Sequence, residues 1–154
     1  MSEMSKLGWR DHAGLEFFQE VIAGRQPQAP MDESVPFRPV AVGEGWIRFL
    51  TRADLRHRNP FGTVHGGFVA TVLDAATACA VHTRLPRGRL ATTIDFQMKL
   101  MRPVSIGDEL HAEGRVINLS RRLGVAEATL KDAAGKLYAH ATATCMVLET
   151  DPAP

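Results

Sequence analysis

The segment from Phe68 to Val81 constrains the fold most, because it has helix-forming residues and almost no polar side. A surface helix keeps one polar face for water, so a helix that is apolar all round has to be covered on every side. Turn residues precede this segment between Asn59 and Gly62, and we expect the helix to run from about Gly66 to Arg84. The rest of the chain therefore has to supply a cover for one central helix.

Four stretches after this helix alternate apolar and polar residues with a period of two, which is typical of half-buried strands. Their predicted inward faces are Ile94, Phe96, Met98 and Leu100; Leu110, Ala112, Gly114 and Val116; Ala126, Ala128 and Leu130; and Leu137, Ala139, Ala141, Ala143, Cys145 and Val147. The small residues of the last stretch suit a sheet that comes close to a helix. Before the helix, Phe37 to Val42 and Trp46 to Thr51 predict a hairpin. The pattern predicts an α+β fold, with a curved antiparallel sheet wrapped around a long central helix.

The chain before this hairpin is predicted to form a separate N-terminal part that packs on the main domain. A short amphipathic helix between Trp9 and Gly24 carries apolar residues at helical spacing, with Gly24 as its C-cap. The connector from Gln26 onward is rich in proline and has no periodicity, so we expect a loop or an extended segment. The predicted division is therefore an N-terminal helix and connector over residues 1–36 and a main domain over residues 37–150.

Composition excludes several classes of function. The 154 residues fit one domain, and a net charge of +1 argues against nucleic-acid binding, which needs clustered Lys and Arg. Met1–Arg25 has no continuous apolar region, so we expect neither a signal peptide nor a membrane span. Cys79 and Cys145 fall in apolar stretches without metal-type spacing, which predicts buried core residues and a cytoplasmic setting. The histidines suggest no metal site either.

Two features of the apolar helix indicate a functional site. An aspartate such as Asp74 is costly in a buried helix unless it is paired or takes part in chemistry. Gly66 and Gly67 at the start of the helix leave backbone N–H groups approachable for an anion or a developing oxyanion. Asp74 follows Gly66 by eight residues, about 12 Å along a helix axis. Either the two groups serve different purposes, or the site forms between two chains and a homodimer is part of the mechanism.

Asn59, His65-Gly66-Gly67 and Asp74 resemble the signature of the hotdog-fold acyl-CoA thioesterases, in the branch of the phenylacetate-pathway and human thioesterase-superfamily-member-2 types. The similarity spans roughly residues 35–148 and extends to later segments, namely Thr92–Phe96, Arg102-Pro103, Gly107-Asp108 and Gly135–Leu137. The resemblance implies a hotdog fold and hydrolysis of an acyl-CoA to a free acid and CoA. It also implies that no cofactor is needed and that the chain forms a homodimer or a homotetramer.

The same resemblance implies roles for single residues. The Gly66 N–H, with help from Asn59, would polarise the thioester carbonyl and hold the oxyanion. Asp74 from the facing subunit would act as general base or as nucleophile. Thr93 would orient the attacking water, although Thr92 is close enough to compete for that position. His65 is expected to shape the loop and its hydrogen bonds more than to transfer protons.

Substrate contacts are predicted from apolar residues near the helix and from cations that could meet the phosphates of CoA. These candidates are Gly67, Phe61, Phe68, Val72, Thr92, Arg102, Arg121, Arg122 and Lys136. The basic group Arg56-His57-Arg58 is read as a phosphate contact or a solvated loop. The apolar candidates favour an aryl or a medium-chain acyl group without choosing between them.

Two alternatives remain open at this stage. A hotdog hydratase or dehydratase would use a catalytic histidine with an acid in a different sequence context. A non-catalytic acyl-CoA-binding or regulatory protein would have no need of both Asp74 and Asn59. A thioester is activated enough for an oxyanion hole and one carboxylate, and the chain has no G-x-S-x-G nucleophile elbow.

Overall fold

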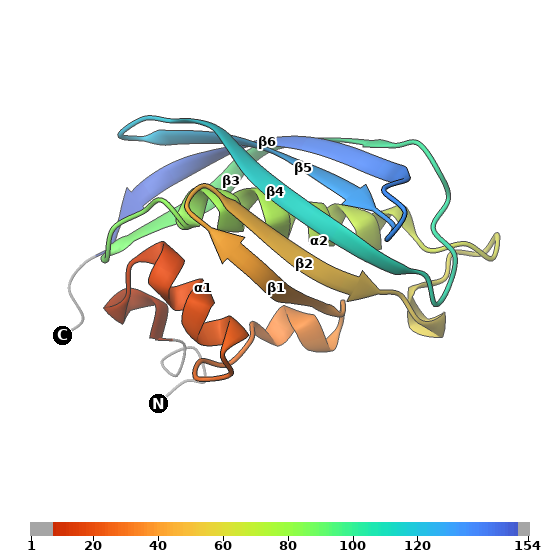
Figure 1. Ribbon diagram of the computed structural model, residues 1–154. Helices are drawn as coiled ribbons and strands as arrows, with labels where there is room; N and C mark the ends of the chain where they lie inside the picture. Colours follow the sequence, from red (N-terminus) through yellow and green to blue (C-terminus); the bar gives the residue numbers. More distant parts are fainter. Residues whose placement is uncertain (1–7, 151–154) are drawn as a thin grey trace.

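A six-stranded antiparallel sheet wraps around helix α2 (Gly66–His82) in the computed structural model, which describes residues 8–150 (Figure 1). The strands are β1 (Phe37–Gly43), β2 (Trp46–Arg52), β3 (Arg89–Leu100), β4 (Glu109–Leu119), β5 (Leu123–Lys131) and β6 (Leu137–Glu149). The predicted α+β architecture is confirmed. The helix was predicted to end at about Arg84 and ends at His82, because the next amides, of Arg84 and Leu85, bond three residues back and no longer four.

The strands do not follow one another across the sheet in chain order. Their order is β1-β2-β4-β5-β6-β3, so β3 pairs with β6 although β4 follows it in the sequence. Within the described residues, β1 and β3 therefore form the two edges of the sheet. The edge of β3 is long, since this strand runs for 12 residues.

Small residues let α2 approach the sheet closely. Ala139, Ala141 and Ala143 of β6 are buried as predicted. A Cβ added to Gly114 of β4 would lie 2.0 Å from the carbonyl oxygen of Ala76 in α2, so no side chain fits at this position. The helix therefore lies in direct contact with the sheet at Ala76. No helix in residues 8–150 combines the length and the apolar character that crossing a membrane requires.

A β-bulge in β3 overturns part of the predicted alternation. The pairing passes from Thr93 opposite Cys145 directly to Asp95 opposite Thr144, which leaves Ile94 as the extra residue. Ile94, predicted to face inward, is 53% exposed, and Leu100 is also exposed. A bulge shifts the alternation of the strand by one residue and re-aims the side chains next to it. Its effect here is to turn Thr93 toward α2.

The N-terminal segment covers the open side of the sheet beside α2 (Figure 1). The predicted helix from Trp9 to Gly24 is instead a 3-10 turn, η2 (Gly8–Asp11), followed by α1 (Gly14–Ile22). The Gly14 amide donates to the Leu85 carbonyl at 3.0 Å, and Phe18 belongs to the main hydrophobic core. The proline-rich connector contains a second 3-10 turn, η3 (Pro30–Glu33). A third 3-10 turn, η4 (Leu55–His57), lies outside the connector, after β2. This arrangement brings the connector against the central helix.

Candidate active site

Asp74 has one side-chain partner among the described residues, the hydroxyl of Thr93. Thr93 Oγ1 donates to Asp74 Oδ1 at 2.8 Å and lies 3.9 Å from the sulfur of Cys145. Asp74 is half-buried on the flank of α2 that faces β3. Thr92 is exposed, so of the two adjacent threonines only Thr93 reaches the carboxylate. A hydrogen bond of this kind fixes the carboxylate in one orientation at the edge of the sheet.

The N-terminus of α2 is capped by His65. Its Nδ1 accepts a hydrogen bond from the Gly67 amide at 2.9 Å, so the ring is unprotonated at Nδ1 in this arrangement. The Gly66 amide has no hydrogen-bond partner in the described part of the chain, and an added Cβ there would meet nothing within 4 Å. An open backbone amide at the positive end of a 17-residue helix is suited to bind an oxygen that carries negative charge.

Asn59 organises the loop before this helix. Its Oδ1 accepts from the amides of Phe61 at 2.9 Å and Thr63 at 3.2 Å, while its Nδ2 donates to the Thr63 hydroxyl at 2.8 Å. Gly62 has a φ of 95°, a conformation that glycine adopts without strain. One hydrogen of the Asn59 carboxamide therefore has no acceptor in the described residues.

His57 is a buried structural residue of this region, although the sequence suggested a solvated or phosphate-binding side chain. Its side chain is 7% exposed, and its ring lies 4.7 Å from the Phe68 ring, measured between centroids. Nδ1 accepts from the Asp54 amide at 3.0 Å, Nε2 donates to the Ser34 carbonyl at 2.7 Å, and the backbone carbonyl accepts from His65. The reading of His57 as a solvated or phosphate-binding residue was therefore wrong. The spacing of Asp54 and His57, which form a capping box, was the signal available in the sequence.

The two halves of the predicted site lie apart within one chain. Gly66 and Asp74 are on the same straight element, α2, eight residues apart, which corresponds to about 12 Å. No hydrogen bond in the described chain joins Asn59 or His65 to Asp74. One chain therefore presents an amide site at the start of α2 and a carboxylate site in its middle.

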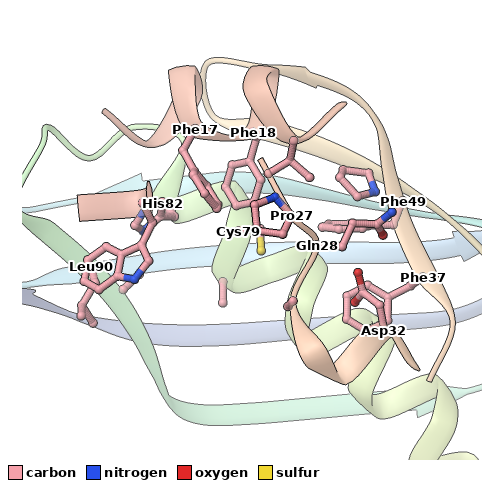
Figure 2. A pocket seen from close by; sticks show the side chains of 16 residues that line it. Phe17, Phe18, Pro27, Gln28, Asp32, Phe37, Phe49, Cys79, His82 and Leu90 are labelled. Atoms are coloured by element: carbon pink, nitrogen blue, oxygen red, sulfur yellow. The ribbon is translucent and has the colours of Figure 1, made fainter. Parts of the chain in front are cut away.

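A cavity of about 340 Å³ lies between the N-terminal segment and α2 (Figure 2). Its walls are mainly apolar and include the aromatic rings of Phe17, Phe18, Phe37 and Phe49. It begins close to the carboxylate site, because Ala78, one helical turn after Asp74, also lines it.

The apolar residues predicted to contact substrate lie elsewhere. Phe61 is 91% exposed in its loop, whereas Phe68 and Val72 are buried in the core. None of the three lines the cavity. Their predicted contacts with substrate remain predictions.

Three titratable groups line the cavity. Burial raises the pKa of Asp32 to about 6, and Asp32 Oδ1 is buried without a hydrogen-bond partner in the described chain. Burial, together with the charges of Asp74 and Asp32, raises the pKa of Cys79 to about 12. Burial also lowers the pKa of His82. At neutral pH Cys79 is therefore a neutral thiol, and thiols are poor nucleophiles.

The candidate cations for CoA lie at opposite ends of the sheet. The Arg102 guanidinium donates to the carbonyl of Leu137, while the Arg122 carbonyl accepts from the amide of Val147. Leu137 and Val147 are ten residues apart on β6, about 33 Å. Arg102 and Lys136 therefore form one group and Arg121 and Arg122 another, and one CoA cannot meet both groups of the same chain. All four side chains are exposed.

Residues 8–150 hold no group of three His, Cys, Asp or Glu side chains that could bind a metal ion. The chemistry that the site offers is that of one oriented carboxylate and one open helix N-terminus. A carboxylate can activate water or attack an electrophile, and a backbone amide can stabilise the oxyanion that forms.

Comparison with known proteins finds relatives of this chain. Acyl-coenzyme A thioesterase 13 of Homo sapiens is 27% identical over 101 residues, which cover 65% of this chain and 71% of that protein. A phenylacetic acid degradation-related protein from Ralstonia eutropha JMP134 has a similar structure, with a TM-score of 0.76 and 29% identity over 84% of this chain and 98% of that one. The phenylacetic acid degradation protein of Thermus thermophilus, solved as a mutant, gives a TM-score of 0.70 and 29% identity, covering 77% and 98%.

The sheet wrapped around one helix is the hotdog fold that the resemblance implied. The family model described as the thioesterase superfamily matches residues 61–139, from just after Asn59 through β3 to the start of β6. This match contains α2 with Asp74 and β3 with Thr93. The chain belongs to the thioesterase superfamily.

Proposed function

We propose that this thioester hydrolase acts on an acyl-CoA with an aryl or medium-chain acyl group and releases the free acid and CoA. The observation that carries the proposal is the hydrogen bond from Thr93 to Asp74, which holds a carboxylate ready at the flank of an otherwise apolar helix. The similarity to acyl-coenzyme A thioesterase 13 supports CoA as the thiol part of the substrate.

In the proposed reaction one group acts on the oxygen of the thioester carbonyl and another acts at its carbon. The Gly66 amide of one copy binds the thioester oxygen and stabilises the negative charge that develops on it. Asp74 of the facing copy takes a proton from water, which attacks the carbonyl carbon, or attacks that carbon itself. The carbon–sulfur bond then breaks and CoA leaves as the thiolate, which takes up a proton. Where Asp74 itself attacks, the acyl group stays on Asp74 as a mixed anhydride, and water cleaves that anhydride to release the free acid and restore the carboxylate. Thr93 positions Asp74 for this step.

The free edge of β3 supports a site shared between two copies. This strand carries Thr93, and on its other side no strand of the described chain pairs with it. Long unpaired edges tend to pair with another strand, and an antiparallel pairing of two identical edges forms a closed two-fold dimer. Such a dimer brings the Asp74 flank of each α2 to the interface. Assembly of dimers into a tetramer remains a prediction from the family resemblance.

The cavity supports an apolar acyl group. Its volume of about 340 Å³ lies at the lower end of the range that is typical of small-molecule sites. It starts one helical turn from Asp74, so a thioester carbonyl at the carboxylate can extend its acyl group between α1 and α2.

Thiol release from a panel of acyl-CoAs tests the activity. We expect turnover by the native protein and a loss of about 100-fold or more in kcat for Asp74→Asn, because general bases contribute rate factors of this size. Asp11→Asn is the matched control, since Asp11 is exposed, lies outside β3 and should leave turnover unchanged. Binding of acyl-CoA without hydrolysis of any panel member would contradict the proposal and favour a binding protein.

Mixed dimers test the shared site. When Asp74→Ala and Gly66→Ala chains are combined, a site made from two chains recovers one intact site in each mixed dimer, or about a quarter of native activity. A site within one chain recovers none. Absence of any recovery, with mixed dimers verified by mass spectrometry, would refute the arrangement across subunits.

A further inference from the structure

His57 joins the N-terminal connector to the start of α2, although it belongs to neither segment. Its side chain is almost completely buried, and both ring nitrogens have partners. Nδ1 accepts a hydrogen bond from the Asp54 amide at 3.0 Å, and Nε2 donates one to the Ser34 carbonyl at 2.7 Å, 23 residues earlier in the chain. Because an amide N–H donates and a carbonyl accepts, these partners fix the tautomer that carries its proton on Nε2. The ring is therefore held in one orientation by two separate segments.

The connector provides a firm anchor for this hydrogen bond. The amides of Ser34 and Val35 both donate to the Met31 carbonyl, at 3.0 and 2.9 Å, which ties this part of the connector to η3. Two residues after Ser34, the Pro36 carbonyl accepts from the buried hydroxyl of Thr51 in β2 at 2.7 Å. The Ser34 carbonyl is thus held between η3 and the sheet.

The backbone of His57 holds the peptide unit that presents the Gly66 amide. This unit joins His65 to Gly66, and its orientation is set by His65, whose backbone is extended with a ψ of 135°. The His65 amide donates to the His57 carbonyl at 2.7 Å, and the His57 ring lies against the Phe68 ring in the first turn of α2. A shift of His57 would therefore tilt the Gly66 amide, while the middle of α2 stays in contact with the sheet.

We propose that His57 is a positioning residue for the hydrolysis, which fixes the start of α2 to the connector and so keeps the Gly66 amide aligned with the thioester oxygen. This inference rests on the proposed function and adds a residue that acts only through Gly66. His57 does not line the acyl cavity. His57 and Ser34 both precede residue 61, where the match to the superfamily begins, so one hydrogen bond makes the connector part of the arrangement that supports catalysis.

Two substitutions separate the link to the connector from the local turn at η4. Asparagine at position 57 puts its carboxamide near the place of Nδ1, so it can accept from the Asp54 amide but cannot reach Ser34. Glutamine puts its carboxamide near the place of Nε2, so it can donate to the Ser34 carbonyl but leaves the Asp54 amide unpaired. Each variant loses one hydrogen bond and the contact of the ring with Phe68, so the two should have similar melting temperatures.

Steady-state kinetics with the best acyl-CoA of the panel tests the positioning role. We expect kcat of His57→Asn to fall by about tenfold, because a displaced amide stabilises the oxyanion less well. KM should change little, since His57 is not in contact with the cavity. His57→Gln should recover most of kcat. Similar kcat values in the two variants, or a larger loss in His57→Gln, would overturn the inference, because the local turn at η4 would then explain the effect.

Combined variants show whether His57 acts through Gly66. In a Gly66→Ala background, His57→Asn should lower kcat/KM by less than about twofold more, because the amide that it positions is already hindered. In a Thr93→Val background the same substitution should keep its effect of about tenfold, since Thr93 acts on Asp74. An equal effect of His57→Asn in both backgrounds would refute action through the Gly66 amide.

Hydrogen–deuterium exchange separates this inference from the proposed function. The His65 amide should exchange faster in His57→Asn than in His57→Gln or the native protein, because its acceptor, the His57 carbonyl, is no longer tied to Ser34. If no acyl-CoA is hydrolysed, this difference still supports the role of His57 in placing the start of α2. Equal exchange in the two variants refutes that role.

Discussion

Replacing Thr93 by valine removes one hydroxyl and nearly conserves the shape of the side chain. The lost interaction is the 2.8 Å hydrogen bond to Asp74 Oδ1, the one side-chain contact that orients this carboxylate in the described chain. A hydrogen bond to a charged group contributes about 1.5–3 kcal/mol, and each 1.4 kcal/mol corresponds to about a tenfold change in rate. Since the hydroxyl positions Asp74, we expect kcat to fall by about 10- to 100-fold.

Steady-state kinetics with the best acyl-CoA of the panel measures this effect. KM should change little, because the Thr93 hydroxyl is engaged with Asp74 and not with the acyl cavity. Thr93→Ser restores a hydroxyl and should recover most of kcat. The matched control is Thr142→Val, since Thr142 is a strand threonine of β6 to which no site role is assigned. Equal losses in the two valine variants, or a rise in KM without a fall in kcat, would refute the positioning role of Thr93.

Three further substitutions have distinct expected outcomes. Gly66→Ala should leave the melting temperature nearly unchanged, because an added Cβ meets nothing within 4 Å. It should lower kcat/KM by about tenfold or more, because the methyl group hinders the approach of the oxyanion to the amide. In Gly114→Ala the new Cβ would clash with the Ala76 carbonyl, so denaturant unfolding should show a loss of about 2 kcal/mol or more. Asp32→Asn should raise the free energy of unfolding at neutral pH by about 1 kcal/mol, after allowance for a half-exposed side chain, and should have little effect below pH 3.8. The sign follows from the raised pKa: the folded protein holds the Asp32 proton more tightly, so stability falls as pH rises from 3.8 through about 6, and Asn removes this loss.

The alternation of β4, β5 and β6 was predictable because the inward face of a regular strand follows from the period of its own sequence. The same reasoning failed at Ile94, since a bulge depends on how β3 pairs with β6 and not on β3 alone. The bulge also determines that Thr93 faces Asp74 while Thr92 is exposed, and the sequence alone could not show which of the two threonines does so. The pairing of β3 with β6 therefore determines which hydroxyl binds the Asp74 carboxylate.

The site was predictable to the extent that it depends on one continuous segment. Gly66 and Asp74 belong to the same helix, and their separation follows from helical geometry. Asp32 was missed because it lies in a connector without periodicity, and only the folding of that connector against α2 brings it to the cavity. His57 was misread because its burial depends on contacts with Ser34 and Phe68 from other segments.

Separate parts of the chain supply the N-terminal wall of the cavity, which we call its roof, and the groups proposed to act on the thioester. α1 and η3 precede residue 61, where the match to the superfamily begins, whereas Asp74 and Thr93 lie inside it. Substitutions in the roof can therefore reshape the cavity and leave the hydrogen bond between Thr93 and Asp74 intact. During evolution, substrate selectivity can therefore change through the N-terminal segment alone, while the residues proposed to carry out the reaction stay the same.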